Sequence, residues 1–236
     1  MKQMIKLKDF VSGSIIECKI GTLKTRSEPS RDLVDFMRSF EDAVKSFRHR
    51  FASRTPHYIV GLLGDQLFSQ VTQRIKELRQ VAPRNKRRVF KQDLGIQEIE
   101  AGVWGSNGRP PKKRSPAIVN MIFQTECGLL PLHIHPRSYR VIVVLEGSGY
   151  GYFSHETLEG FSGKSIARVS LGRGAILCYG GDTLHTFGTE GSAIELLTYH
   201  SRYFPFEGDE QYSIPPNYWS PNKFIAFKTN GSSTQI

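Results

Sequence analysis

The sequence has 236 residues, of which 39% are hydrophobic and 23% charged, as is typical of a soluble globular protein. Its apolar runs are short, for example Val141 to Leu145, and fall far below the ~20 residues of a membrane-spanning helix, so no membrane span is expected. The basic start lacks the apolar stretch of a secretory signal, which predicts a cytoplasmic protein. The three cysteines, Cys18, Cys127 and Cys178, are too widely spaced for a disulfide framework or a zinc knuckle and are expected to be reduced.

The net charge of +10 is concentrated in the first half of the chain. Residues 1–115 hold 24 lysines and arginines against 12 acidic residues, whereas residues 116–236 hold 8 against 10. Basic residues are densest at 84–91 and 112–114. Such runs can contact phosphates, nucleic acid or an acidic partner. No recognition motif accompanies them, so a solvated surface is the favoured interpretation and nucleic-acid binding is the alternative.

Two helices are predicted in the first hundred residues. Apolar residues recur at steps of three and four from Leu33 to Phe51, which indicates an amphipathic helix with Ser30 as its N-cap. A second helix is predicted to begin at Pro56, because proline is well tolerated in the first helical position, and to end before Pro83. Together, the two predicted helices would form a helical hairpin within residues 30–94 that packs on the following domain. A basic N-terminal segment, residues 1–29, would precede the hairpin.

Short strands are predicted from about residue 95 to 205. Runs rich in β-branched and aromatic residues alternate there with glycine-containing turns, which favours an antiparallel sandwich or barrel. The predicted strands are Ile96–Trp104, Ala117–Gln124, Arg140–Leu145, Tyr150–Phe153, Ile166–Leu171, Ala175–Tyr179 and Ala193–Tyr199. Residues 206–236 are expected to form an extended strap over the barrel and a loose tail.

Three histidines form the most informative pattern in the chain. His133 and His135 are two residues apart, and residues with that spacing in a β-strand project to the same face. Both imidazoles can therefore bind one metal ion. His185 follows a second glycine-containing segment and supplies a third imidazole. For these three histidines the joint spacing favours a metal site over ordinary core or surface positions.

The two segments that carry these histidines resemble the paired motifs of the cupin superfamily. The three histidines and the motif glycines keep the family spacing, the glycines being Gly128, Gly147 and Gly174. Four positions depart from the motifs: Arg140 replaces the metal-binding Glu, Gly180 a Pro, Asp182 a Gly and Thr189 an Asn. The resemblance covers roughly residues 95 to 205. It implies a mainly β protein, a cupin-type jelly-roll β-barrel with the ligand site inside it, preceded by the N-terminal helical hairpin.

A weaker similarity connects the chain with thiol dioxygenases of the cysteine dioxygenase type. These proteins have helices before the barrel, three histidines on iron and an inward tyrosine on the last barrel strand. The segment from Ala193 to Tyr199 looks like that strand, so the resemblance implies Tyr199 as a catalytic group. Alternation along a strand places Glu195 and Leu197 on the same face as Tyr199. Leu197 stands where the family has a histidine partner of the tyrosine, and Arg140 stands where it has Cys or Gly.

Arg140 restricts how the predicted metal site can work. A guanidinium about 5 Å from a divalent cation costs roughly 6 to 7 kcal/mol at an effective dielectric near 20. Glu195 could offset this cost from the facing strand, an anionic substrate could bridge Arg140 and the metal, or Arg140 could extend out of the site. As a fourth possibility, the barrel holds no metal and binds an organic anion.

The leading hypothesis is an iron(II) oxygenase that acts on a small anionic chelating substrate. His133, His135 and His185 would hold the metal, Arg140 and Glu195 would bind substrate, and Tyr199 would donate a hydrogen bond. Three neutral histidines suit Fe(II), with manganese, nickel, cobalt or zinc as alternatives.

Two other functions stay open. One is a non-enzymatic cupin that binds a small anionic ligand and contacts a partner or nucleic acid through its basic half. The other is a metal-dependent isomerase or lyase, because a fold does not fix a reaction. A homodimer is a further possibility, since cupins are often dimers.

Overall fold

The computed structural model describes residues 2–10, 12–21, 23, 28–51, 58–81, 87–91, 96–125, 132–189, 193–204 and 233–234. Within these ranges the chain forms two helices and thirteen strands. In chain order they are β1 (Lys2–Asp9), β2 (Ile15–Gly21), α1 (Pro29–Phe51), β3 (Tyr58–Leu62), α2 (Asp65–Val81), β4 (Arg87–Lys91), β5 (Ile96–Gly105), β6 (Ala117–Thr125), β7 (Arg140–Glu146), β8 (Gly149–Ser154), β9 (Ile166–Leu171), β10 (Ala175–Tyr179), β11 (Leu184–Thr189), β12 (Ile194–His200) and β13 (Ser233–Thr234). All seven strands predicted between residues 95 and 205 are present.

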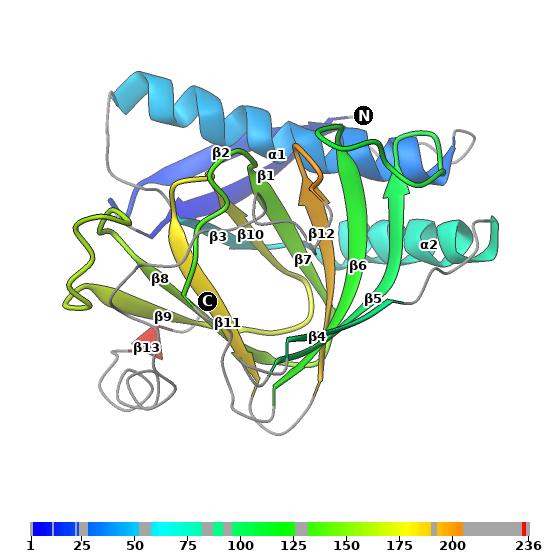
Figure 1. The fold of residues 1–236 in the computed structure, drawn as a ribbon. Helices are drawn as coiled ribbons and strands as arrows, with labels where there is room; N and C mark the ends of the chain where they lie inside the picture. The colour runs from blue at the N-terminus through cyan, green and yellow to red at the C-terminus, as the bar shows by residue number, and fades with distance from the viewer. Residues whose placement is uncertain are drawn as a thin grey trace.

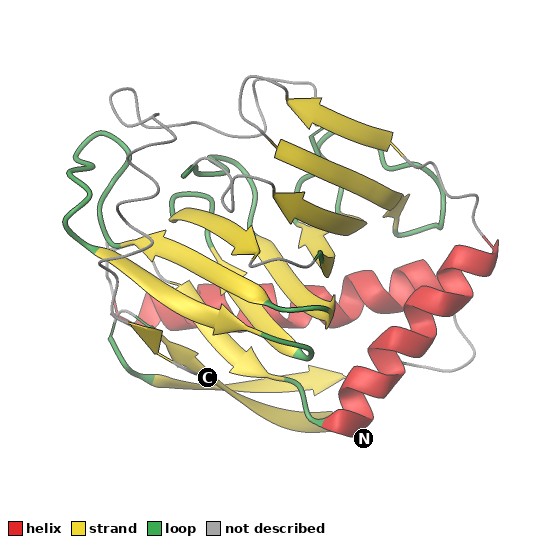
Figure 2. Cartoon of the chain, turned by 90° about the horizontal axis from the view of Figure 1, so that it is seen from below, coloured by secondary structure: helices red, strands yellow, loops and turns green. Residues whose placement is uncertain are grey.

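The strands form two sheets that pack against each other (Figures 1 and 2). The large sheet has nine strands in the order β2-β1-β3-β10-β7-β12-β6-β5-β4, and the small sheet has the order β11-β8-β9-β13. Between them lies an apolar core to which β7 contributes Ile142, β10 contributes Leu177 and β11 contributes Phe187. This mainly β architecture with two helices confirms the predicted fold class.

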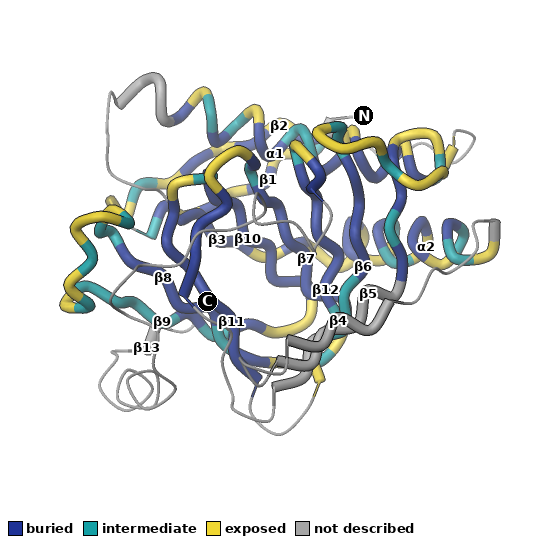
Figure 3. Tube along the Cα trace, in the orientation of Figure 1, coloured by how far each residue is buried: buried dark blue, intermediate teal, exposed yellow. Residues whose placement is uncertain are grey.

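Both helices pack on the other face of the large sheet (Figure 1). A second apolar cluster joins Phe40 of α1 and Val71 of α2 to Val143 of β7 and Ile176 of β10. The central strands are therefore buried on both faces, as the dark blue traces of β7, β10 and β12 show (Figure 3). We call the face toward the small sheet the inner face and the face under the helices the outer face.

The first helix begins one residue before its predicted N-cap. α1 starts at Pro29, where the missing N–H of proline leaves no helical hydrogen bond unmade. Ser30 therefore lies inside the first turn, and the N-cap prediction is wrong. The Ser30 hydroxyl instead donates a hydrogen bond to the carbonyl oxygen of Ser106, at 3.2 Å, and so ties the helix to the segment that follows β5.

The second helix starts later than predicted, because a strand precedes it. Tyr58, Ile59 and Val60 are buried and form β3, which lies between β1 and β10 in the large sheet. Aromatic and β-branched residues suit a strand that is covered on both faces. α2 then begins at Asp65, and Pro56 lies outside the described residues. The two helices still contact each other, and Arg74 of α2 pairs with Asp32 of α1 at 2.9 Å.

The N-terminal segment and the tail also contain strands that were not predicted. β1 and β2 pair as an antiparallel hairpin, in which Ile5 and Leu7 are buried and Lys6 and Lys8 are exposed. At the other end, Ser233–Thr234 pairs in parallel with β9, so the tail is not loose at these two residues. The predicted strap at residues 214–227 lies outside the described residues. Neither of the two described helices is long and apolar enough to cross a membrane.

Candidate metal centre

The three predicted metal ligands come together inside the barrel. His133, His135 and His185 are all buried, and their nearest ligand atoms lie within 4.8 Å of one another. His133 and His185 face each other across an isolated antiparallel bridge, in which each backbone N–H donates to the other's carbonyl oxygen at 3.0 Å. The bridge fixes the separation of the two backbones, and the two-residue spacing carries His135 into the same cluster.

Two glycines allow this arrangement. Gly174, one of the motif glycines, adopts a φ of +84°, a conformation that other residues avoid. At Gly181, an added Cβ would lie 2.4 Å from the carbonyl oxygen of His135. Only a residue without a side chain lets the turn before β11 approach the His135 segment this closely.

His185 is oriented as a metal ligand would be. Its Nδ1 lies 2.8 Å from the carbonyl oxygen of Thr183 and donates to it, which leaves Nε2 with its lone pair. Nε2 is buried and has no hydrogen-bond partner among the described residues. Burial, together with the neighbouring His133, holds the pKa of His185 well below its usual value. The imidazole is therefore neutral at pH 7, the form that binds metals.

The donor set fits a divalent transition metal. Two nitrogens at about 2.1 Å from one tetrahedral ion lie about 3.4 Å apart, so the rings must move inward to share an ion. Three imidazoles leave coordination positions open, which is typical of catalytic and not of structural sites. Cys178 is buried, and burial raises the pKa of its thiol well above the usual value, so it is a poor thiolate ligand. Cys127 and Gly128 lie outside the described residues.

Arg140 is 2% exposed and close enough to this cluster for its charge to act on His185. Its Nη1 donates to the hydroxyl of Ser138, and its Nη2 is buried without a hydrogen-bond partner among the described residues. Burial lowers the pKa of the guanidinium to about 10, so Arg140 is charged at pH 7. Its charge contributes to the lowered pKa of His185. No carboxylate within the described ranges forms an ion pair with it, so within this part of the chain no acidic side chain balances its charge.

Arg140 belongs to a row of four polar residues that runs across neighbouring strands on the inner face. In register, His200 of β12 lies opposite Arg140 of β7, Arg140 lies opposite Tyr179 of β10, and Tyr179 lies opposite Tyr58 of β3. The Tyr179 ring stacks on Tyr58 at 5.5 Å and reaches His185 at 4.0 Å between centroids. His200 Nδ1 and the Tyr58 hydroxyl are buried, and neither has a hydrogen-bond partner among the described residues. The row therefore offers unsatisfied polar groups beside the histidines.

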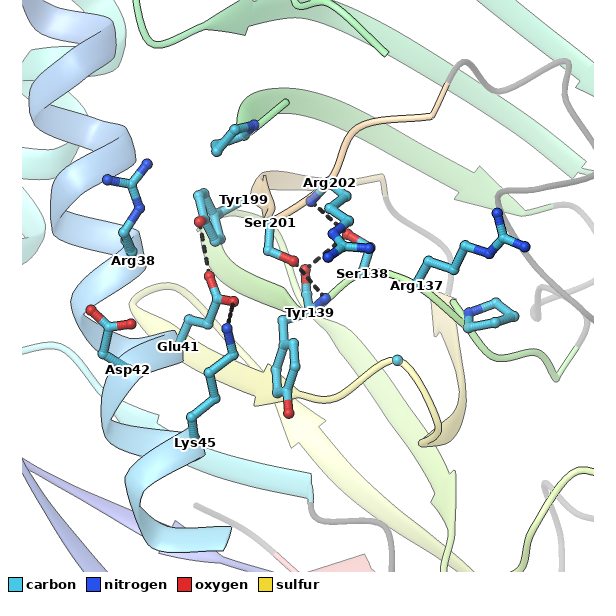
Figure 4. Close-up of a pocket in the computed structure, with 13 residues that line it drawn as sticks. Arg38, Glu41, Asp42, Lys45, Arg137, Ser138, Tyr139, Tyr199, Ser201 and Arg202 are labelled. Carbon is cyan, nitrogen blue, oxygen red and sulfur yellow. Dashed lines mark hydrogen bonds and ion pairs between the residues drawn. The ribbon is translucent and has the colours of Figure 1, made fainter. Parts of the chain in front are cut away.

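Tyr199 and Glu195 do not join the site, although both were predicted to line the barrel. Tyr199 lies on the outer face, where its hydroxyl donates to Glu41 of α1 at 2.9 Å (Figure 4). Glu195 is also on that side and forms an ion pair with Arg79 of α2. Alternation correctly placed the two residues on one face of the strand, but that face packs under the helices. The predicted inward placement is wrong for both.

Three residues of the inner face were not predicted as site residues. His200 follows Tyr199 directly, so the same alternation puts it on the opposite, inner face, and this signal could have identified it. Tyr179 ends a predicted strand, and its parity with Leu177 points inward. Tyr58 lay in a segment read as helix, so no pattern in the sequence pointed to it.

The comparisons with known proteins add little to this site. No family model matches the sequence, and no curated protein matches it. Among solved structures, the chain is similar to a mutant of Bacillus subtilis oxalate decarboxylase, with 13% identity, a TM-score of 0.40 and coverage of 63% of this chain and 36% of that chain. It is also similar to Lactobacillus farciminis oxalate decarboxylase in a formate complex, with 14% identity, a TM-score of 0.39 and coverage of 63% of this chain and 39% of that chain. A Streptomyces PAC13 variant with uridine is similar as well, with 18% identity, a TM-score of 0.37 and coverage of 58% of this chain and 90% of that chain.

The chain thus spans less than two fifths of the two oxalate decarboxylase chains. At TM-scores of 0.40 and below, these likenesses carry no argument.

Proposed function

We propose that the barrel is a metal-dependent enzyme, an iron(II) oxygenase, that acts on a small anionic substrate able to chelate the metal. The observation that carries the proposal is the buried guanidinium of Arg140 beside three buried histidines: its Nη2 has no hydrogen-bond partner, and the group forms no ion pair, among the described residues. The histidines supply neutral donors and the guanidinium supplies a positive charge with donors to spare. The complementary ligand is therefore a small anion.

The position of Glu195 strengthens this argument. Of the four ways to accommodate Arg140, compensation by Glu195 fails, because that carboxylate pairs with Arg79 on the outer face. Extension of Arg140 out of the site fails as well, because its side chain is buried. A substrate that brings its own negative charge to Arg140 remains, as does a barrel without metal.

The chain's own residues would bind and orient that substrate. Arg140 would hold a carboxylate or a similar oxyanion through its planar fork of donors. His200 Nδ1 is the next unsatisfied polar atom in the row, and burial holds the pKa of His200 well below its usual value, so the ring is neutral. Burial raises the pKa of Tyr179, which therefore stays protonated beside His185. The metal, when bound, would supply open positions for a chelating substrate and dioxygen.

The test is metal analysis of the purified protein after anaerobic addition of iron(II) and desalting, followed by oxygen-uptake measurements. We expect close to one equivalent of metal in the wild type and in a His155→Ala control, and almost none in a His133→Ala/His135→Ala variant. The loaded wild type should then consume oxygen when a small anionic thiol or another chelating acid is added. Metal binding without uptake across thiols, diketones and hydroxylated aromatic acids would contradict the oxygenase.

A metal-free binder of organic anions is the second candidate. It is favoured by one observation, that Arg140 brings positive charge where the resembled motif has a metal-binding carboxylate. This candidate predicts no retained metal in either the wild type or the variant, together with anion binding that is lost in Arg140→Met. Stoichiometric metal that is lost with the two histidines would rule it out.

A further inference from the structure

The nine-stranded sheet ends at strand β2, which pairs with β1 on one side and with no described strand on the other (Figure 1). The Asp9 N–H donates to the Ser14 carbonyl oxygen at 2.8 Å and so marks one hydrogen-bonded pair of the hairpin. Such pairs alternate with non-hydrogen-bonded pairs along an antiparallel ladder. By that alternation, the backbone N–H and C=O groups of Ile15, Glu17 and Lys19 face away from β1. They form an open edge with which another strand can pair.

The two faces of β2 differ in burial. Every second side chain is buried under α1 on the outer face; these residues are Ile16, Cys18 and Ile20. The side chains between them are exposed on the other face; these residues are Ile15, Glu17 and Lys19. Among the described residues, the exposed large apolar side chains all lie on β1, β2 and β3; they are Met4, Ile15 and Leu62. Exposed apolar surface thus gathers at this end of the large sheet, as it does at sites of protein association.

The sequence of β2 is complementary to itself in an antiparallel register that is centred on Cys18. Two copies of β2 in this register place Glu17 of each copy opposite Lys19 of the other, and Ile16 opposite Ile20. Opposite charges directly across two strands stabilise their pairing, whereas like charges destabilise it. A register centred on Glu17 or on Lys19 would bring two like charges together. A register centred between two residues would set buried side chains against exposed ones, so the charges and the pleat select one register.

The neighbouring strand β1 strengthens this charge pattern. Within one chain, Glu17 lies opposite Lys6, and Lys19 lies opposite the uncharged Met4. A second copy would place Lys19 on the other side of Glu17 and would give Lys19 an acidic neighbour. An exposed lysine on an edge strand usually discourages pairing with other strands. Glu17 removes that obstacle for a second copy of β2, because the same strand carries both charges at the required spacing.

The opposite edge of the large sheet lacks this complementarity. It is formed by β4, whose five residues include the three basic residues Arg87, Arg88 and Lys91. Two copies of β4 in an antiparallel register centred on Val89 would place Arg87 opposite Lys91. Like charges would then face each other across the strands. Of the two edges of this sheet, β2 is therefore the one suited to self-association.

From this edge we infer that the β2 strands of two copies of the chain pair in antiparallel fashion and form a homodimer. The twofold axis passes beside Cys18, and the two large sheets become one continuous sheet. The interface uses the same strand in both copies, as a closed twofold dimer requires. The inference is independent of the proposed function, because neither the three histidines nor Arg140 lie on β1 or β2.

Analytical ultracentrifugation of the full chain over a range of concentrations tests the inference. We expect a species of twice the chain mass of 26.7 kDa. Glu17→Lys and Lys19→Glu should each raise the dimer dissociation constant roughly tenfold or more, because each turns both cross-strand pairs into like-charge pairs. Lys8→Glu is the matched control, since it reverses an exposed charge on the same face but on β1, away from the edge. It should leave the dissociation constant unchanged.

A mixture of the two charge variants tests the register. Glu17→Lys has two lysines at the edge and Lys19→Glu has two glutamates, so an equimolar mixture should form a heterodimer about as tight as the wild-type dimer. Thermal midpoints confirm that both variants fold. If one does not, the double variant Glu17→Lys/Lys19→Glu replaces the mixture, because it restores opposite charges across the axis and should dimerise.

Four results would overturn the inference. A monomeric wild type would mean that the β2 edge stays open or is covered within the chain. Unchanged dimers in both charge variants would place the interface elsewhere. Folded charge variants that do not associate when mixed would exclude the register centred on Cys18. Loss of the dimer in Lys8→Glu would show that net charge controls association, and not the pairing of β2.

Discussion

The two faces of the nine-stranded sheet treat buried polar groups in opposite ways. On the outer face, the Glu195 carboxylate accepts hydrogen bonds from Arg79 and from Asn120 Nδ2, the latter at 2.8 Å, and Tyr199 donates to Glu41. On the inner face, Arg140 Nη2 and His200 Nδ1 are buried with no hydrogen-bond partner among the described residues. The groups of both faces lie on the same central strands, β7 and β12, or on elements that pack on these strands.

This difference separates groups that stabilise the fold from groups that, under the proposed function, would bind a ligand. A buried polar group without a partner costs about 1–3 kcal/mol, and more if it is charged, so unsatisfied groups are normally removed unless they serve a function. The outer-face groups satisfy one another across the helix–sheet contact. The inner-face groups have no such partners among the described residues, and under the proposed function a ligand in the barrel would supply them, so substitutions should have opposite effects on the two faces.

The largest effect is expected at Arg140. In Arg140→Met, an apolar side chain of similar length replaces a buried, unpaired charge, so the free energy of unfolding should rise by about 1–3 kcal/mol. Anion binding in the barrel should fall by at least a hundredfold. Urea denaturation and titration with the anions that support activity measure the two effects.

Arg140→Lys is the matched control, because it keeps the charge but loses the planar fork of donors. It should show no gain in stability and only a partial loss of anion binding. A less stable Arg140→Met protein would contradict the comparison, since it would mean that Arg140 is satisfied within the fold.

At Glu195, a substitution is expected to lower the free energy of unfolding, in contrast to Arg140→Met. Glu195→Ala leaves Arg79 and the buried Asn120 without their shared acceptor, and we expect a loss of about 2 kcal/mol in the free energy of unfolding. Glu146→Ala is the control, because Glu146 is the exposed cross-strand neighbour of Glu195 and should change stability little. If the two variants lost the same free energy of unfolding, the ion pair between Glu195 and Arg79 would contribute nothing to stability.

The pH dependence of stability should sharpen the comparison at His200. Burial first, and then the charge of Arg140, hold the pKa of His200 well below 6.5 in the folded protein, so the unfolded chain binds one more proton below that pH. Stability should therefore be full above pH 6.5 and fall as the pH drops below it, by up to about 1.4 kcal/mol per pH unit for this group. His200→Asn should remove the contribution of this group, about 1.4 kcal/mol per pH unit, from the slope of stability against pH. Urea denaturation of metal-free protein between pH 7 and 5 measures it. An unchanged slope would place His200 in contact with solvent.

Much of the site could be predicted from the sequence because it depends on local spacing. The His-x-His pair, Arg140 and His185 belong to two short motifs. The neighbouring strands can be recognised because their sequences either alternate apolar and polar residues or are continuously apolar. Which face of β12 is the inner one could not be predicted, because both faces are buried and apolar residues such as Leu196 and Leu197 occupy both. The direction depends on where the helices pack, and that is a long-range property.

The first strands were missed for a different reason. Ile5 and Leu7 alternate with Lys6 and Lys8, a period of two that indicates a strand, but the basic composition of the segment also suits a solvated surface. Pro56 and the apolar residues from Leu63 onward favour a single helix, and such a helix includes Tyr58–Leu62. In both cases the strand depends on pairing with distant residues, β1 with β2 and β3 with β10.

The smallest effect is expected at Tyr199, and it tests the comparison most directly. The resemblance to thiol dioxygenases implied a catalytic tyrosine, whereas the structure pairs this hydroxyl with Glu41 on the outer face. Tyr199→Phe removes one hydrogen bond, so the free energy of unfolding should fall by about 1 kcal/mol, while metal content and oxygen uptake stay at wild-type values. Glu41→Gln keeps an acceptor for the hydroxyl and should cost less than Tyr199→Phe. If Tyr199→Phe instead abolished oxygen uptake with metal content and thermal midpoint unchanged, the hydroxyl would have to reach the inner face during the reaction, and the division between the two faces would fail at this residue.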